Sequence, residues 1–298
     1  MVDFKTRPIE YIDGIPVFCK EDEYISNYIN ISEDHLSSLE ESGNNPFIEE
    51  ELWKDLETST IKLLEKIGEP VVKKSIVLDV GVGTGRLLNI IEAREKFGID
   101  ISIPYLKKVK KLGIDVICSK VEDIPYENES FDIVFATDIL EHVLDLNKAI
   151  KEITRLLKPK GYFILRVPYK EDIENYLKEE YPYKFSHLRN FDISTIKAFF
   201  TRIFNYDIID YCFSRPYYKP NNAKLRLLSE KSPLFSFLKS NEVMEVGHPL
   251  NFLSKLAISQ EEIVAAIYDL RDNHPSWFKY IESYVAEPLE ISVLLQKN

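Results

Sequence analysis

The segment from Val77 to Arg86, with the sequence VLDVGVGTGR, constrains the fold of this chain more than any other segment. Its apolar first half is typical of a strand that is covered on both faces of a sheet. Gly81, Gly83 and Gly85 then follow at alternate positions, where they let the backbone turn sharply and approach a ligand. The segment therefore predicts a buried strand, a glycine turn at its carboxyl end and the start of a helix.

The glycine spacing and the acid before it restrict the ligand. A dinucleotide-binding turn has glycines at its first, third and sixth positions and places a diphosphate at the N-terminus of a helix. Here the sixth position is Arg86, and Asp79, two residues before Gly81, would repel a diphosphate but attract an ammonium group. A ligand that carries an amino acid on an adenosine therefore fits this turn better than a dinucleotide does.

From about Ser75 to Val167, the order of motifs resembles that of class I S-adenosylmethionine-dependent methyltransferases. The glycine turn is similar to motif I of that family, and later family segments resemble VEDIPYENESFDIVFATDILEHV and LLKPKGYFILRV. The resemblance implies methyltransferase activity, with S-adenosyl-L-methionine as the cofactor. The cofactor-binding residues that it implies are Asp79, Gly81, Val82, Gly83, Gly85, Asp100, Ile101, Val121, Glu122, Asp138 and Ile139.

Two of these positions have an expected partner on the cofactor. Asp100 ends the run FGID, where a second parallel strand would end, and its carboxylate is able to accept both ribose hydroxyls. One of the adjacent acids Glu122 and Asp123 would contact the adenine, while the other would be a solvated loop acid. We favour Glu122, with the amide of Val121 reading the edge of the ring.

Strands and helices are expected to alternate along the middle of the chain. The expected strands are 77–80, 97–100, 115–119, 131–136, 162–167 and 206–213, and the expected helices are 46–67, 86–95, 103–112, 144–157 and 194–204. Alternation of this kind predicts an α/β fold with a doubly wound, mostly parallel sheet and helices on both faces. The family resemblance implies a seven-stranded, Rossmann-like sheet whose last strand, near 291–295, is antiparallel.

The chain is longer than this fold requires, which predicts two additions. Residues 1–45 form an N-terminal extension that resembles the end of a small zinc-ribbon module but lacks its cysteine pairs, so we interpret it as a metal-free remnant. Residues 46–213 and 289–298 form the methyltransferase domain. Residues 214–288 form a helical insertion between the last two strands, expected to serve as a lid or substrate region.

The first third of the insertion is basic, although the whole chain carries a formal charge of −11. Its basic residues are Arg215, Lys219, Lys224, Arg226, Lys231 and Lys239, set among Leu, Phe and Tyr. This pattern suits an acidic or phosphorylated partner, and it equally suits a solvated face that pairs with the acidic body. The overall negative charge makes nucleic acid an unexpected partner, because phosphate binding needs clustered lysine and arginine.

Composition restricts the cellular location of the protein and the role of its cysteines. No apolar run is long enough to span a membrane, and the first residues lack the apolar core of a secretion signal, so we expect a cytoplasmic location. Cys19, Cys118 and Cys212 are far apart and odd in number, which gives neither a disulfide framework nor a zinc site. Methyl transfer from a sulfonium needs no metal, and none is expected.

Two histidines lie where active-site loops are expected, and an oxygen nucleophile would need such a base. His142 follows the fourth strand in DILEHV, and His187 follows the fifth in YPYKFSHLRNFD. Glu141 either orients His142 or caps the next helix, and each histidine has the alternative of a purely structural role. Tyr183 and Arg189 are candidates to bind an acidic group or an aromatic substrate.

Three functions remain open from the sequence. The leading hypothesis is O-methylation of a small molecule or sugar-containing intermediate, including a glycan. An RNA methyltransferase is the second, although residues 137–140 lack the Asn-Pro-Pro-Tyr type of tetrad that amino-directed enzymes carry there. The third is a noncatalytic regulatory protein that retains the cofactor fold. The substrate, the acceptor atom and the oligomeric state are not predicted.

Overall fold

The computed structural model describes residues 2–48, 50–214, 216–217, 273 and 287–298. Residues 1–215 and 290–298 form one compact unit, and residues 216–289 form a second. In the second unit, β9 (Pro216–Tyr217) pairs antiparallel with β10 (Glu287–Pro288). Most of the predicted insertion, including its basic segment, lies outside the described residues. The functions that the sequence assigns to the extension and the insertion stay predictions.

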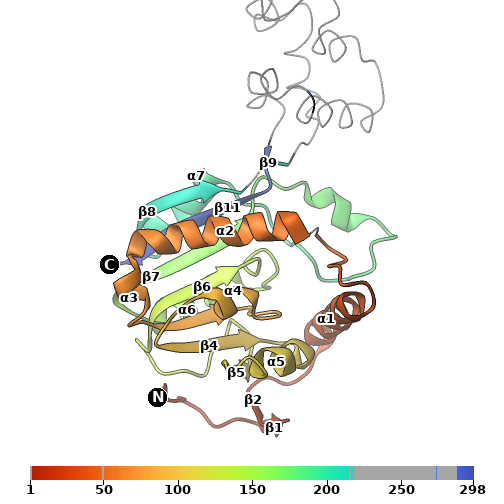
Figure 1. Cartoon of the computed structure of the whole chain (residues 1–298), viewed down its shortest axis with the longest axis horizontal. Coiled ribbons are helices and arrows are strands. Elements are labelled where there is room, and N and C mark those ends of the chain that lie inside the picture. Colours follow the sequence, from red (N-terminus) through yellow and green to blue (C-terminus); the bar gives the residue numbers. More distant parts are fainter. Residues whose placement is uncertain (1, 49, 215, 218–272, 274–286) are drawn as a thin grey trace, which may run out of the picture. The chain divides into compact units, whose positions relative to one another are not determined.

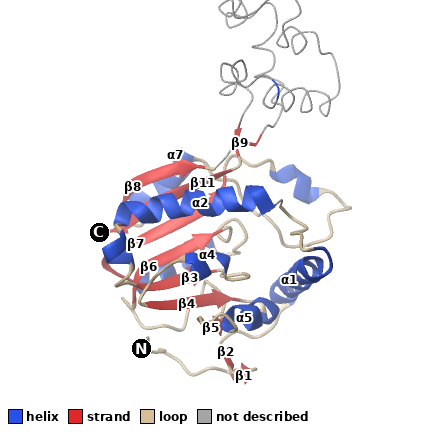
Figure 2. Ribbon diagram, in the orientation of Figure 1, coloured by secondary structure: helices blue, strands red, loops and turns tan. Residues whose placement is uncertain are grey.

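The first unit contains one mixed sheet with helices on both sides (Figures 1 and 2). Its strands are β1 (Glu10–Ile12), β2 (Ile15–Val17), β3 (Ile76–Val80), β4 (Glu95–Asp100), β5 (Asp115–Cys118), β6 (Phe131–Thr137), β7 (Leu157–Pro168), β8 (Tyr206–Phe213) and β11 (Glu290–Lys297). Its helices are α1 (Glu23–Ser42), α2 (Glu50–Ile67), α3 (Glu69–Val72), α4 (Arg86–Ile90), α5 (Ile103–Lys110), α6 (Leu146–Leu156) and α7 (Ile193–Lys197), with the 3₁₀ helix η1 (Ile173–Leu177) and the π-helix η2 (Ala198–Ile203).

The strand order is β1-β2-β5-β4-β3-β6-β7-β11-β8. Strands β5, β4, β3, β6 and β7 are parallel, and β11 is antiparallel to both of its neighbours, β7 and β8. This arrangement confirms the predicted doubly wound sheet with an antiparallel last strand. Strands β1 and β2 form a hairpin with its turn at Asp13 and Gly14, which extends the sheet beyond β5 and adds two strands to the seven that were expected.

Alternate residues of the central strands face two separate cores. Val77 packs with side chains of α2, α4 and α5, whereas the next residue, Leu78, packs with side chains of α6, α7 and η2. Side chains of a strand alternate between the two faces of a sheet, so a strand buried on both faces must be apolar throughout. The run IVLDV of β3 is fully buried, and the only charge in it is Asp79.

One helix prediction is wrong, and one helix was not predicted. The helix expected over 86–95 ends at Ile90, because Ile91 is buried in extended conformation and the chain then enters β4 at Glu95. The sequence also gave no prediction of α1, a helix of 20 residues. It begins at Asp22, whose side chain accepts from the amide of Ile25, and it ends at Gly43 in left-handed conformation.

Two of the cysteines that are remote in sequence are neighbours in the fold. The amide of Phe18 donates to the carbonyl of Cys118 at 2.8 Å, which extends the pairing of β2 with β5. Sγ of Cys19 consequently lies 3.7 Å from Sγ of Cys118. Both thiols are free. None of the helices in the described residues is long and apolar enough to cross a membrane.

Candidate active site

The glycine turn after β3 brings the backbone close to two neighbouring segments. Gly81 has a φ of 76°, and a Cβ at this position would lie 2.9 Å from Cδ1 of Ile139. Gly83 has a φ of 50°, and a Cβ there would point into open space. The turn is therefore closed on the Ile139 side and open at Gly83, as a cradle for a ligand requires. Gly85 lies at the N-terminus of α4, also at positive φ.

Asp79 lies at the carboxyl end of β3 and is only 2% exposed. Its Oδ1 is buried and has no hydrogen-bond partner within the described structure. Burial raises the pKa of this carboxyl well above its ordinary value, although the charge of Arg166 opposes the shift. A buried carboxylate oxygen without a partner is costly, so the site favours a cationic ligand at this point.

Asp100 ends β4 and faces the same turn. Its Oδ2 accepts from the amide of Gly83 and its Oδ1 from the amide of Ser102, each at 2.9 Å. Burial raises the pKa of Asp100, and these amides act in the opposite direction. Each carboxylate oxygen has a second lone pair, so the predicted contacts with two ribose hydroxyls are compatible with this geometry. Val82 is buried against Gly98, and Ile101 directly follows Asp100.

The acids of the next loop differ in their surroundings. Val121 is buried in the core, and Glu122 is half-buried, with its Oε1 accepting from the amide of Asp145 at 3.4 Å. Asp123 is exposed and forms an ion pair with Lys5 at 3.6 Å. The more enclosed position of Glu122 favours it over Asp123 as the adenine contact, which stays a prediction.

Asp138 and Arg166 form a charged cluster with Glu290 between β6, β7 and β11. The Arg166 side chain is only 4% exposed, its Nε lies 3.2 Å from Oδ1 of Asp138 and its Nη2 lies 2.5 Å from Oδ2. Nε also lies 2.9 Å from Oε2 of Glu290, at ion-pair distance but without hydrogen-bond alignment. Burial alone would raise the pKa of Asp138, but Arg166 more than offsets this and holds it below its ordinary value.

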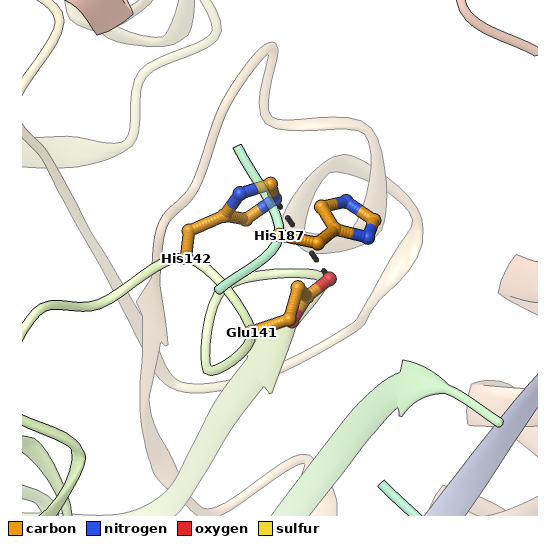
Figure 3. A group of neighbouring side chains, drawn as sticks. All are labelled: Glu141, His142 and His187. Carbon is orange, nitrogen blue, oxygen red and sulfur yellow. Dashed lines mark ion pairs between the residues drawn. The ribbon is translucent and has the colours of Figure 1, made fainter. Parts of the chain in front are cut away.

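The loop after β6 and the segment before α7 bring both predicted histidines together. The ring centroids of His142 and His187 lie 4.6 Å apart, and Oε1 of Glu141 is 3.8 Å from Nε2 of His142. Figure 3 shows the three side chains converging from two separate segments. Burial lowers the pKa of His142 to about 3, helped by His187, so its imidazole is neutral. Nδ1 of His187 pairs with Oε2 of Glu171.

Hydrogen bonds between these two segments fix the histidine pair. The amide of Leu188 donates to the carbonyl of Glu141 at 2.9 Å, and Nη1 of Arg189 donates to the carbonyl of Leu140 at 2.6 Å. The Arg189 side chain therefore holds the loop after β6 by binding a backbone carbonyl of that loop. Tyr183 is placed elsewhere, because its hydroxyl donates to Oδ2 of Asp34 on α1 at 2.7 Å. The predicted substrate contacts of Arg189 and Tyr183 stay predictions.

Several site residues were missed by the sequence reasoning. Arg166 had a signal, since an arginine inside the apolar run FILRV is unusual unless it is paired. Glu171 and Glu290 had none, because each reaches the site from another segment of the chain. The helical spacing of Tyr24 and Tyr28 suggested core packing or closure over the methionine end, and the centroid of the Tyr28 ring lies 5.6 Å from that of His142, edge-on. The N-cap of α6 is Asp145, so Glu141 does not cap that helix.

Comparison with known proteins identifies the domain. Residues 78–165 match the methyltransferase domain family. A tRNA (carboxymethyluridine(34)-5-O)-methyltransferase of Arabidopsis thaliana is 31% identical over 33% of this chain and 25% of its own length. A ubiquinone/menaquinone biosynthesis C-methyltransferase of Rickettsia massiliae is 30% identical over 44% of this chain and 56% of its own length.

The fold is shared with solved structures. A SAM-dependent methyltransferase from Thermotoga maritima aligns with a TM-score of 0.52 and 14% identity, over 92% of this chain and all of that one. Residues 78–165 therefore form part of a methyltransferase domain, and the fold matches that of an S-adenosylmethionine-dependent methyltransferase. The chain spans about half the length of most curated relatives that it matches.

The buried carboxyl of Asp79 leads to a prediction for the variant Asp79→Asn. We expect the cofactor to bind more weakly by about 1–3 kcal/mol, because a charged hydrogen bond is lost. The folded-state pKa of Asp79 is raised, so its contribution to stability is complete below the ordinary value of 3.8 and is lost as pH rises through the folded-state pKa. The neutral variant without cofactor should therefore be at least as stable as the wild type at neutral pH.

The measurements for this prediction are calorimetric titration with S-adenosylhomocysteine and thermal unfolding without ligand. Asp115→Asn, at the exposed start of β5, is the matched control and should change neither quantity. If Asp79→Asn binds the cofactor as tightly as the wild type does, Asp79 does not contact the cofactor.

Proposed function

We propose that this chain transfers the methyl group of S-adenosylmethionine to an oxygen atom of a small molecule or a sugar-containing intermediate. The observation that carries the proposal is the Glu171–His187 pair beside Glu141 and His142, at the carboxyl end of β6. Open parallel sheets bind their ligands at this edge. A histidine paired with a carboxylate is suited to accept a proton, because the carboxylate stabilises the imidazolium that forms.

The cofactor would lie over the glycine turn. Asp79 would receive the ammonium group, Asp100 the ribose hydroxyls, and Glu122 with the amide of Val121 the adenine. Asp138 and Ile139 would border the methionine end. Two observations support this placement: Oδ1 of Asp79 has no hydrogen-bond partner among the residues that the structure describes, and the space at Gly83 is open.

The proposed reaction is a single displacement. The acceptor hydroxyl gives up its proton at the histidine cluster as its oxygen bonds to the methyl carbon, and the bond from that carbon to sulfur breaks. The products are a methyl ether and S-adenosylhomocysteine. The sulfonium already activates the methyl group, so this chain's contribution is alignment and removal of the proton. His187 is better suited than His142, because burial makes His142 a weak base.

Methylation of an RNA oxygen is the second candidate. The observation in its favour is the Arabidopsis relative, whose name gives an O-methyltransferase acting on tRNA. The Rickettsia relative is named a C-methyltransferase, so relatives at this level of identity differ in acceptor. RNA binding predicts an affinity that falls steeply as salt is raised, since counterions are released from the phosphates.

The two candidates are separated by a labelling experiment. The purified chain is incubated with S-adenosylmethionine labelled in its methyl group and with either total RNA or the small-molecule fraction of a cell extract. We expect label in small molecules, in a form that resists the loss typical of methyl esters under mild base. Label in RNA alone would favour the second candidate. Binding of S-adenosylhomocysteine without any labelled product would instead indicate a noncatalytic protein.

A further inference from the structure

We propose that Glu141, His142 and His187 bind a divalent transition-metal ion of the zinc class. One ligand atom from each of the three residues lies within 4.8 Å of the others. Two imidazoles and one carboxylate are a ligand set found at catalytic zinc sites and at sites of other first-row metals. The sequence did not indicate this site, since His187 lies 45 positions after His142.

The carboxylate of Glu141 is the strongest reason to infer a cation. Glu141 is 1% exposed, and neither of its oxygens has a hydrogen-bond partner within the described part of the chain. The nitrogen of His142 that lies near this carboxylate is Nε2, 3.8 Å from Oε1 of Glu141. Buried polar atoms are almost always satisfied, and a cation bound by Nε2 and the carboxylate would satisfy Glu141. Arg189 does not serve this purpose, because its donated hydrogen bonds go to backbone carbonyls.

A second reason is the way in which His187 is held. Its Nδ1 faces Oε2 of Glu171 and lies 3.3 Å from the Tyr176 hydroxyl. If Nδ1 carries the proton that bonds to Glu171, the lone pair of Nε2 is available for an ion. Histidine ligands of metals typically donate their other nitrogen to a carboxylate in this manner. The packing of Tyr28 against His142 and of Tyr176 against His187 further restricts the rings.

The inference rests on the proposed function for its chemical meaning. Tetrahedral zinc with bonds of about 2.1 Å places its ligands roughly 3.4 Å apart, so a modest contraction of the cluster would complete three bonds. The remaining position would be open to the acceptor hydroxyl. Coordination lowers the pKa of a bound hydroxyl, so with the ion bound this effect would replace proton acceptance by His187, whose lone pair then binds the ion, and the proton of the acceptor would leave to solvent.

The test is a zinc titration of the full chain after treatment with a chelator, followed by calorimetry. Cobalt is used in parallel, because its visible absorption reports the geometry of its ligands. We expect one zinc ion per chain, weak binding of magnesium, and loss of zinc binding in Glu141→Gln and in His187→Ala. Glu171→Gln, which leaves the ligands in place but releases His187, should lower zinc affinity by about 10- to 100-fold.

Two controls separate this site from others. Glu174→Gln, an exposed neighbour of Glu171, should bind zinc as the wild type does. Cys19→Ser should also retain the single site, which excludes the Cys19–Cys118 pair as the ligand. Absence of stoichiometric zinc binding, or zinc binding unchanged in both Glu141→Gln and His187→Ala, would overturn the inference.

Folding and the proposed function are followed separately in the same samples. Circular dichroism reports folding, and titration with S-adenosylhomocysteine reports the cofactor site. If S-adenosylhomocysteine binds but zinc does not, the metal inference fails while the proposed function stands. If zinc binds but the thioether does not, the proposed function fails instead. Should one ligand variant fail to fold, the other and Glu171→Gln still decide the outcome.

Discussion

Arg166→Met should lower the free energy of unfolding by about 3–5 kcal/mol, the scale for removing one partner of a buried ion pair. Arg166 balances Asp138 and Glu290, and its Nη1 donates to Oγ1 of Thr60 on α2 at 3.2 Å. Methionine fills similar space but leaves both carboxyls without their cation. Because Arg166 holds the pKa of Asp138 down, the variant also loses stability that the wild type has above pH 3.8.

Denaturant unfolding at neutral pH measures this loss, read from the midpoint at unchanged slope. Arg202→Met, at an exposed position of η2, is the matched control and should stay within about 0.5 kcal/mol of the wild type. Adding Asp138→Asn to Arg166→Met should recover part of the stability, because the uncompensated carboxylate is then absent. If Arg166→Met lost less free energy of unfolding than Arg202→Met does, solvent would reach Arg166 and screen the charges of the cluster.

His187→Ala should reduce turnover by about 10²- to 10⁴-fold, the usual contribution of a general base. Affinity for S-adenosylhomocysteine should remain close to that of the wild type, because the proposed cofactor contacts come from the glycine turn and from the segments that follow β4, β5 and β6. His142→Ala should also lower turnover while sparing the cofactor. The two effects should be far from additive, since the rings touch and act as one unit.

Steady-state kinetics with the substrate found by labelling, together with calorimetry, measure this split. Lys178→Ala, an exposed position before His187, should change neither quantity. If turnover and cofactor affinity fall equally in His187→Ala, the histidine supports the structure of the loop and the catalytic assignment is wrong. If turnover is unchanged, proton removal occurs elsewhere.

The central domain was largely predictable because its signals are local. The alternation of apolar strands with helices requires a parallel sheet, and the glycine turn with Asp79 marks the ligand edge of that sheet. The helix over 86–95 was mispredicted because its end depends on tertiary packing and not on local signals. Its apolar pattern suits a helix, but Ile91 is pulled into extended conformation by burial and by the short connection to β4.

The sequence by itself determined the fold class, the glycine turn and the two acids that face it, because Asp79 directly precedes the turn and Asp100 ends the neighbouring parallel strand at the same edge of the sheet. Only the tertiary structure decided that Glu171 pairs with His187, that Arg166 lies between Asp138 and Glu290, and that Glu141 is buried with no hydrogen-bond partner among the described residues. These contacts join segments that are far apart along the chain. Their formation depends on how helices and strands pack, which local residue patterns do not encode.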